Sequence, residues 1–113
     1  MFNTDSERRF QNLISQKEGL IISEATLLVS DLLDAAYSVM FQNGLNTDLC
    51  HEIESLFSEF NTEGIDYGGG REKAEYLWNE DAFNYFNNIC PDDYYFGSNE
   101  GDGACIGFFQ INE

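Results

Sequence analysis

Hydrophobic residues recur every three to four positions along most of the chain, the spacing that gathers them on one face of an α-helix. This pattern predicts helices over about residues 4–18, 24–42, 48–60 and 71–90. In the second of these the apolar stripe is broad and begins at Leu27 and Leu28, so we expect that helix at the centre of the core. The short apolar run from Leu20 to Ile22 is either a buried strand or a link that packs onto the next helix.

The pattern changes after Pro91, which disfavours helical backbone at the residue before it. Two aromatic segments follow, residues 94–97 and 104–111, and a turn rich in Gly, Asn and Asp joins them, as in a β-hairpin. For a chain of 113 residues we therefore expect one domain of the α+β class over residues 1–113. It should be mainly helical, with about four helices over about residues 4–90 packed against a C-terminal two-stranded antiparallel hairpin at about residues 93–111.

Aromatic residues occupy both faces of the predicted hairpin. Tyr94, Phe96 and Phe108 alternate with Tyr95 and Phe109 along the two segments. One face should pack on the helices. The other face, which carries Tyr95, is either covered by the N-terminal segment or exposed as a contact patch for a partner.

Two stretches interrupt the helical pattern. Residues 61–70 are rich in turn formers and contain three consecutive glycines, which predicts a mobile loop. A phosphate-binding loop is disfavoured there, because no Gly-Lys-Ser/Thr sequence follows. Within the last helical region, Asn79, Glu80 and Asp81 predict a fresh helix start that divides the region in two.

The composition adds a formal net charge of −16 at pH 7, from 21 Asp and Glu against five Lys and Arg. A small domain needs only roughly 2 to 8 units of charge for solubility, and further like charge costs stability. Hydrophobic residues make up 42% of the chain, which is enough for a packed core and excludes an acidic disordered tail. The excess charge fits either a merely acidic protein or a surface that meets a basic partner. Direct binding to nucleic acid or to an anionic membrane is disfavoured, because both require Lys and Arg.

Two groups of carboxylates are the candidate partner-binding residues. The first group lies along the third predicted helix and at its end, where spacings of four and seven residues place side chains on one face. Its members are Asp48, Glu52, Glu59 and Glu63. The second group borders the hairpin and consists of Asp92, Asp93, Glu100 and Asp102. The alternative for both groups is a solvated surface without a partner.

Catalytic and metal-binding patterns are weak. Cys50 and His51 are neighbours on a helix, where side chains point about 100° apart, so we assign no nucleophile–base pair and no catalytic residue. The three cysteines follow no regular spacing, which predicts reduced thiols. No Cys-x-x-Cys pair supports zinc, and the EF-hand-like run from Ser98 to Gly103 lacks a Glu at its twelfth position, so we expect no metal and no cofactor.

The run from Tyr94 to Phe109, YYFGSNEGDGACIGFF, resembles a C-terminal signature of small uncharacterised proteins of phages and plasmids. In these proteins a Tyr-Phe-Gly segment precedes a Gly-Asp-Gly turn and an aromatic end. Small acidic proteins of this kind look like inhibitors of host defence of the anti-CRISPR or antirestriction type, some of which mimic the charge of DNA. The resemblance covers less than a fifth of the chain, and it implies a class of function without assigning a role to any residue.

Charge and resemblance together favour a non-enzymatic inhibitor. Its acidic surface would occupy the basic nucleic-acid-binding groove of a CRISPR effector or another nuclease, with carboxylates in place of phosphates. One alternative is an immunity protein or antitoxin that neutralises a cationic nuclease toxin, and another is a small metal- or ligand-binding regulator. We expect a monomer or a homodimer. We also expect it in the cytoplasm of a bacterial host cell, because the N-terminal residues lack the apolar core of a signal peptide and no segment is long and apolar enough to span a bilayer.

Overall fold

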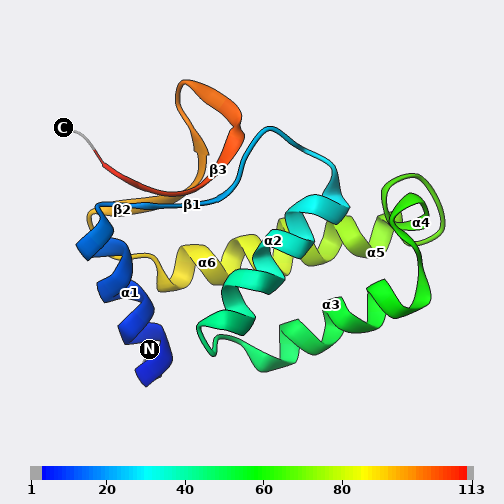
Figure 1. Ribbon diagram of the computed structural model, residues 1–113, viewed down its shortest axis with the longest axis horizontal. Coiled ribbons are helices and arrows are strands. Elements are labelled where there is room, and N and C mark those ends of the chain that lie inside the picture. The colour runs from blue at the N-terminus through cyan, green and yellow to red at the C-terminus, as the bar shows by residue number, and fades with distance from the viewer. Residues whose placement is uncertain (1–3, 112–113) are drawn as a thin grey trace.

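The helices lie on one side of a small antiparallel sheet, and helices and sheet share a hydrophobic core (Figure 1). The computed structural model describes residues 4–111. In chain order the elements are α1 (Asp5–Lys17), β1 (Leu20–Ser23), α2 (Val29–Gln42), α3 (Thr47–Glu59), α4 (Thr62–Tyr67), α5 (Arg71–Tyr76), the π-helical segment η1 (Leu77–Ala82), α6 (Phe83–Ile89), β2 (Tyr94–Asn99) and β3 (Asp102–Gln110). The predicted α+β class, mainly helical with a C-terminal antiparallel hairpin, is confirmed. No helix among the described residues is long and apolar enough to cross a membrane.

The sheet contains a third strand that the predicted two-stranded hairpin did not include. Its order is β1-β3-β2, and both pairs are antiparallel. The apolar run before α2 is therefore a strand, with Leu20 opposite Phe108. Gly107 permits the close approach of β1, because a Cβ at this position would stand 2.2 Å from the backbone oxygen of Leu20.

Aromatic rings fill the space between the sheet and the helices. Phe96 and Phe108 pair across β2 and β3 with ring centroids 4.9 Å apart, and both rings also contact Phe86 of α6. Phe10 of α1 meets Phe108 edge-on at 5.4 Å. Such ring pairs add about 0.5–1.5 kcal/mol beyond the burial of their area, so this cluster attaches both the hairpin and the first helix to α6.

The other face of the hairpin carries Tyr95 and Phe109, whose rings lie 5.6 Å apart and remain half-exposed. Within residues 4–23, α1 packs on the inner face through Phe10 and β1 extends the edge of the sheet, so this part of the chain does not cover the outer face. The outer face is half-exposed, and its role as a contact patch stays a prediction.

Helix α2 begins at Val29 rather than at the predicted residue 24. Ala25 has a left-handed φ of 63°, which interrupts helical backbone, and Leu27 and Leu28 are exposed instead of buried in the core. The N-cap residue Leu28 has no side chain that can cap α2, although the Thr26 hydroxyl accepts a hydrogen bond from the Leu28 N–H at 3.2 Å.

The start of α2 is fixed from elsewhere in the chain, by Asp66 of α4. The buried Asp66 carboxylate accepts hydrogen bonds from the Ser30 backbone N–H (2.8 Å) and the Ser30 hydroxyl (2.6 Å). It takes the place of a local N-cap, because it satisfies an N–H of the first helical turn that has no partner within the helix.

Residues 61–70, predicted as a mobile loop, form α4 and a tightly packed glycine turn. Asn61 caps α4 by accepting a hydrogen bond from the Gly64 N–H at 2.7 Å. A Cβ at Gly70 would come within 2.8 Å of the Phe60 ring. The glycines of this turn therefore allow the backbone to pack against α3 and α4.

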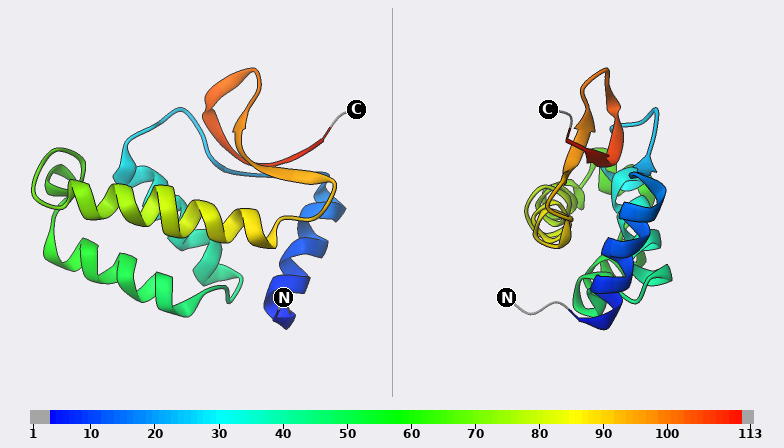
Figure 2. Two further views of the ribbon diagram at one scale, coloured as in Figure 1. Left: turned by 180° about the vertical axis from the view of Figure 1, so that it is seen from behind. Right: turned by 90° about the vertical axis from the view of Figure 1, so that its left-hand side faces the viewer.

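The last helical region is one continuous helix over residues 71–89, made of α5, η1 and α6 (Figure 2). The break predicted at residues 79–81 is absent, and these residues lie in the π-helical turn. The backbone stays in the right-handed helical region at both junctions, Leu77 and Ala82. A wider π turn accommodates the polar residues without ending the helix.

Candidate functional site

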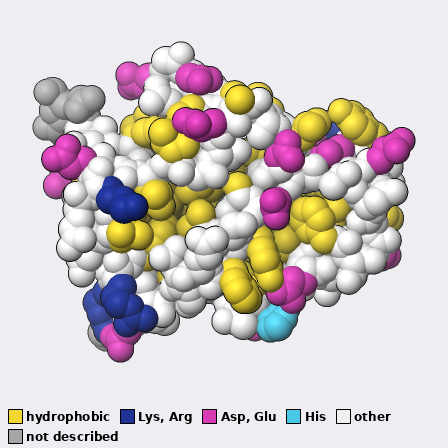
Figure 3. All heavy atoms as spheres, in the orientation of Figure 1, with side chains coloured by type: hydrophobic (Ala, Val, Ile, Leu, Met, Phe, Trp, Pro, Cys, Tyr) yellow, Lys and Arg dark blue, Asp and Glu magenta, His cyan; other side chains and the backbone are white. Residues whose placement is uncertain are grey.

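Acidic and basic residues are divided unevenly along the chain. All five Lys and Arg lie on two elements: Arg8, Arg9 and Lys17 on α1, and Arg71 and Lys73 on α5. Residues 18–70 contain ten Asp and Glu and no Lys or Arg, and of these ten only Asp66 is buried. Figure 3 shows carboxylates spread over this face of the molecule, with cationic side chains gathered mainly at the end where α1 lies. Helices α2 and α3 therefore present carboxylates to solvent with no compensating Lys or Arg of their own.

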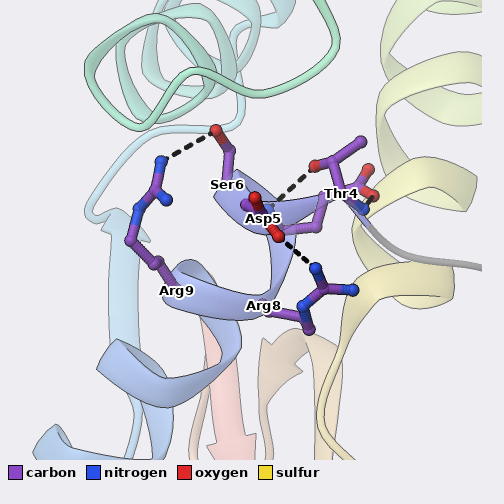
Figure 4. Close-up of polar contacts among 6 residues, drawn as sticks. Thr4, Asp5, Ser6, Arg8 and Arg9 are labelled. Atoms are coloured by element: carbon purple, nitrogen blue, oxygen red, sulfur yellow. Dashed lines mark hydrogen bonds and ion pairs between the residues drawn. The ribbon is translucent and has the colours of Figure 1, made fainter.

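Several cations are engaged by neighbours on their own helix. At the start of α1, Arg8 forms an ion pair with Asp5, and Arg9 Nη2 donates a hydrogen bond to Ser6 Oγ at 3.2 Å (Figure 4). On α5, Arg71 Nε pairs with Glu75 Oε1 at 2.6 Å. Exposed pairs of this kind contribute only about 0–1 kcal/mol to stability. The carboxylates of Asp5 and Glu75 neutralise Arg8 and Arg71 locally, and the negative potential of α2 and α3 stays in place.

Three of the predicted carboxylates share one side of α3. Asp48, Glu52 and Glu59 are all exposed, and their spacing places them along roughly 16 Å of the helix axis. We call these three residues the acidic ridge. Glu63 lies outside it, because the backbone becomes extended at Phe60 and α4 starts in a new direction. Glu63 is exposed in the first turn of α4, where a negative charge stabilises a helix.

The hairpin carboxylates do not form one rim. Asp92 and Asp93 precede β2, whereas Glu100 and Asp102 lie at the turn, and the six-residue strand between them spans roughly 20 Å. The sheet and α3 also lie on opposite sides of the molecule (Figures 1 and 2). One flat partner surface cannot contact the acidic ridge and the hairpin carboxylates together.

The hairpin turn uses its own oxygens to hold its backbone. Asn99 Oδ1 accepts a hydrogen bond from the Gly101 N–H at 2.8 Å, and Asp102 Oδ1 accepts one from the Ala104 N–H at 3.1 Å. This explains the EF-hand-like spacing of oxygen-bearing residues as turn chemistry. Within residues 4–111, no group of three or more His, Cys, Asp or Glu side chains is placed to hold a metal ion.

A cleft of about 480 Å³ separates α2 from α3. At 100° per residue, its α3 residues lie more than about 90° around the helix from the acidic ridge. It is lined by Asp34 and Tyr37 of α2 and by Ile53, Glu54, Phe57 and Ser58 of α3. We call it the aromatic cleft. At its edge the Tyr37 ring stacks on the Phe41 ring, with centroids 5.6 Å apart and planes 17° from parallel, and the Phe41 side chain is 66% exposed. An open cleft bordered by an exposed ring pair and carboxylates is a feature typical of contact surfaces.

Tyr37 and Glu54 join the two walls of this cleft. The Tyr37 hydroxyl donates a hydrogen bond to Glu54 Oε2, and this bond, followed by burial, raises the pKa of Tyr37 to about 12. His51 Nδ1 lies 3.5 Å from the other carboxylate oxygen, Glu54 Oε1. The Glu54 carboxylate is thus held at the cleft by two side chains.

A second exposed apolar surface lies where the start of α2 meets α4 and α5. Leu27, Leu28 and Tyr67, with exposed fractions of 64%, 43% and 71%, border a depression of about 270 Å³ that Trp78 also lines. Residues 24–28 leave the sheet without helical structure, which is why the two leucines reach solvent.

Cys50 and His51 point to different partners. The Cys50 thiol is buried and donates to the backbone oxygen of Leu45 at 3.7 Å, whereas His51 is exposed and faces Glu54. Burial, followed by the charge of Glu54, raises the pKa of Cys50, so little thiolate is present at neutral pH. Cys50, Cys90 and Cys105 are all free, and burial raises the pKa of Cys90 to about 11.

Comparison of the chain with protein-family models, with curated proteins and with solved structures finds no match. The resemblance of the C-terminal segment to small phage and plasmid proteins stays a prediction.

Sequence patterns placed the acidic ridge correctly on one helix face but missed the aromatic cleft. Tyr37 and Phe57 belong to the apolar patterns of their helices and pack against the core, and both also line the cleft. The available signal was the spacing of Asp34, Tyr37 and Phe41 on α2, which are three and four residues apart and so share a face. The opposite wall depends on how α3 packs on α2, which the pattern of either helix does not show.

Proposed function

We propose that this protein is an inhibitor that binds the basic nucleic-acid-binding surface of a nuclease, such as a CRISPR effector, in the cytoplasm of a bacterial cell. The observation that carries the proposal is the charge division: residues 18–70 hold ten carboxylates and no Lys or Arg, and nine of the ten side chains are exposed. Repulsion among so many like charges lowers the stability of a folded domain, and binding to a basic partner would account for this cost.

The proposed contact surface surrounds α3, with the acidic ridge on one side of the helix and the aromatic cleft on another, so that a groove receiving α3 would contact both. The ridge offers carboxylates at fixed positions on a rigid helix, and Lys and Arg side chains that bind phosphates accept carboxylates in the same way. Long-range attraction would speed the encounter and orient the inhibitor, and the exposed rings of the cleft would supply contact area once the two proteins meet. The hairpin carboxylates lie on the other side of the molecule and are left outside this contact.

The proposal is tested by capture from bacterial lysate at about 50 mM NaCl, where the Debye length is still more than 10 Å, followed by mass spectrometry. The wild-type protein should retain a nuclease or CRISPR effector. A variant with Asp48→Asn, Glu52→Gln and Glu59→Gln should lose it.

A matched control neutralises three exposed carboxylates away from α3, with Asp92→Asn, Asp93→Asn and Glu100→Gln, and should keep the partner. Equal capture by the ridge variant and the wild type would overturn the proposal. If the captured nuclease is a toxin encoded beside this gene, the protein is an immunity protein with the same binding chemistry.

A further inference from the structure

We propose that the aromatic cleft holds an arginine side chain of the basic partner, with its guanidinium between Asp34 and Glu54 and its plane against the Tyr37 ring. This inference rests on the proposed function, since it names the group that the same surface selects. It goes beyond charge, because the cleft would distinguish arginine from lysine.

The two walls of the cleft carry complementary charge for one cation. Asp34 lines it from α2 and Glu54 lines it from α3. Helices α2 and α3 hold no Lys or Arg, and the one basic side chain beside these carboxylates is His51, whose Nδ1 lies 3.5 Å from Glu54 Oε1. A planar guanidinium has five N–H donors in a fixed fork and can bond two carboxylates at once, whereas an ammonium acts as a compact point charge.

Tyr37 gives the cleft an aromatic face. Phe41 stacks on this ring with planes 17° apart but does not line the cleft, so a guanidinium in the cleft would meet the side of the Tyr37 ring that Phe41 leaves free. Guanidinium groups stack on such faces more readily than ammonium groups and gain cation–π attraction there. Carboxylates alone, such as those of the acidic ridge, do not offer this stacking contact.

The cleft is already organised for such a ligand. The hydrogen bond from the Tyr37 hydroxyl to Glu54 Oε2 holds the carboxylate and the ring in fixed relative positions across the two helices. Ile53 and Phe57 provide the apolar floor along which the methylene part of an arginine side chain can lie. Less conformational entropy is lost when the binding groups are held before the ligand arrives.

The test is an NMR titration of the ¹⁵N-labelled full chain with two octapeptides, one of alternating arginine and glycine and one of alternating lysine and glycine. The two peptides carry equal charge. The arginine peptide should bind about three- to tenfold more tightly, the size of one cation–π contact, and should shift the signals of Tyr37 and Phe57.

Two pairs of matched variants locate the effect. Tyr37→Ala should reduce the arginine preference to near unity, whereas Tyr76→Ala, which removes an exposed tyrosine ring outside the cleft, should leave it unchanged. Asp34→Asn should weaken binding of the arginine peptide more than Asp31→Asn, an equal change of charge on the same helix. Circular dichroism of each variant checks that the fold is kept.

Equal affinity for the two peptides would overturn the arginine site, as would a preference that survives Tyr37→Ala. If both peptides bind equally and both are weakened by the acidic-ridge variant, the arginine site is wrong while the proposed acidic inhibitor stands. If neither peptide binds at about 50 mM NaCl, the arginine site is also wrong, and the capture experiment decides the proposed function separately.

Discussion

At the residue scale, Asp66 is the polar side chain on which the helical packing depends most. It is buried, and both of its carboxylate oxygens accept hydrogen bonds from Ser30 at the start of α2. Asp66→Ala would leave the Ser30 N–H and hydroxyl buried without partners. We expect a loss of about 1–3 kcal/mol in the free energy of unfolding, measured by urea denaturation.

The matched control for this substitution is Asp34→Ala, which removes an exposed carboxylate from the same pair of helices. It should change the free energy of unfolding by less than about 0.5 kcal/mol. If Asp66→Ala were as mild as this control, the long-range cap would have no role in stability.

Glu7 provides a pH dependence that can be assigned to one residue. Burial raises the pKa of Glu7, but hydrogen bonds from the Thr4 backbone, from the Tyr85 hydroxyl (2.7 Å) and from the Thr4 hydroxyl outweigh it, so the net pKa is lowered from 4.5. A lowered pKa in the folded state stabilises the protein above the unfolded pKa, and this contribution is lost as the pH falls through the folded value. The Glu7–Tyr85 contact should therefore stabilise the protein at pH 7 and fade below about pH 4.5.

Tyr85→Phe removes the hydroxyl while it keeps the ring. At pH 7 this variant should be less stable than the wild type by about 1 kcal/mol, and at about pH 3 the difference should be smaller. Thermal unfolding followed by circular dichroism at both pH values measures this. The comparison with wild type at each pH cancels the general effect of protonating the other carboxylates. A difference in Tm that does not depend on pH would contradict the assigned role of Glu7.

Residue-scale contacts of this kind were the least predictable from the sequence. The structure shows Thr4 as the cap of α1, with Glu7 completing a capping box. The cap of α2 lies 36 residues away in the sequence, so no local pattern at residues 24–28 could reveal it. The pattern therefore extended α2 too far and placed Leu27 and Leu28 in the core.

At the element scale, strand β1 depends on the absence of a side chain at one position of β3. A Cβ at Gly107 would stand 2.2 Å from the Leu20 oxygen and 2.8 Å from the Ile21 Cα. Gly107→Ala should force β1 away from β3, with a destabilisation of about 1–3 kcal/mol from overpacking. Hydrogen exchange should show loss of protection in β1, while the β2–β3 hairpin keeps most of its own.

Gly103→Ala is the natural control for this prediction, because a Cβ there would meet nothing within 4 Å. It should leave the exchange of β1 unchanged. Normal protection of β1 in Gly107→Ala would show that the pairing of β1 with β3 is not held by this close contact.

The sequence pattern predicted the long helices and the hairpin, but it did not predict the segments that join them. The pattern predicted α1, α3 and the hairpin closely, because each has a strong apolar period and clear turn or cap residues. Residues 61–70 were taken for a loop on their glycines, although these glycines pack against Phe60. The polar residues Asn79–Asp81 did not end the long helix, since a π turn places them on its surface without a break.

At the scale of the whole molecule, the charge of −16 should weaken the fold at low ionic strength. Raising NaCl from about 20 mM to about 500 mM screens the repulsion between carboxylates and should raise the Tm. The acidic-ridge variant with Asp48→Asn, Glu52→Gln and Glu59→Gln should be as stable as the wild type to within about 0.5 kcal/mol, because lost repulsion offsets the lost helix-terminus charge of Asp48. A large loss of stability in this variant would mean that the ridge serves the fold rather than a partner.

The candidate site was predictable in part. Net charge and a four- and seven-residue spacing were enough to place Asp48, Glu52 and Glu59 on one helix face. The sequence could not show that Glu63 leaves this face at the bend after α3, or that the hairpin carboxylates lie on the far side of the molecule. It also could not show the aromatic cleft, whose two walls come from different helices.

The central claim is that the α2–α3 surface occupies a site that nucleic acid would otherwise fill. Its most direct test is a competition experiment, in which the captured nuclease binds labelled DNA or RNA and this protein is added. The account predicts that the wild-type protein displaces the nucleic acid, that the acidic-ridge variant displaces at least about tenfold less, and that displacement weakens from about 50 mM to about 500 mM NaCl. A stable ternary complex of nuclease, nucleic acid and this protein would contradict the claim.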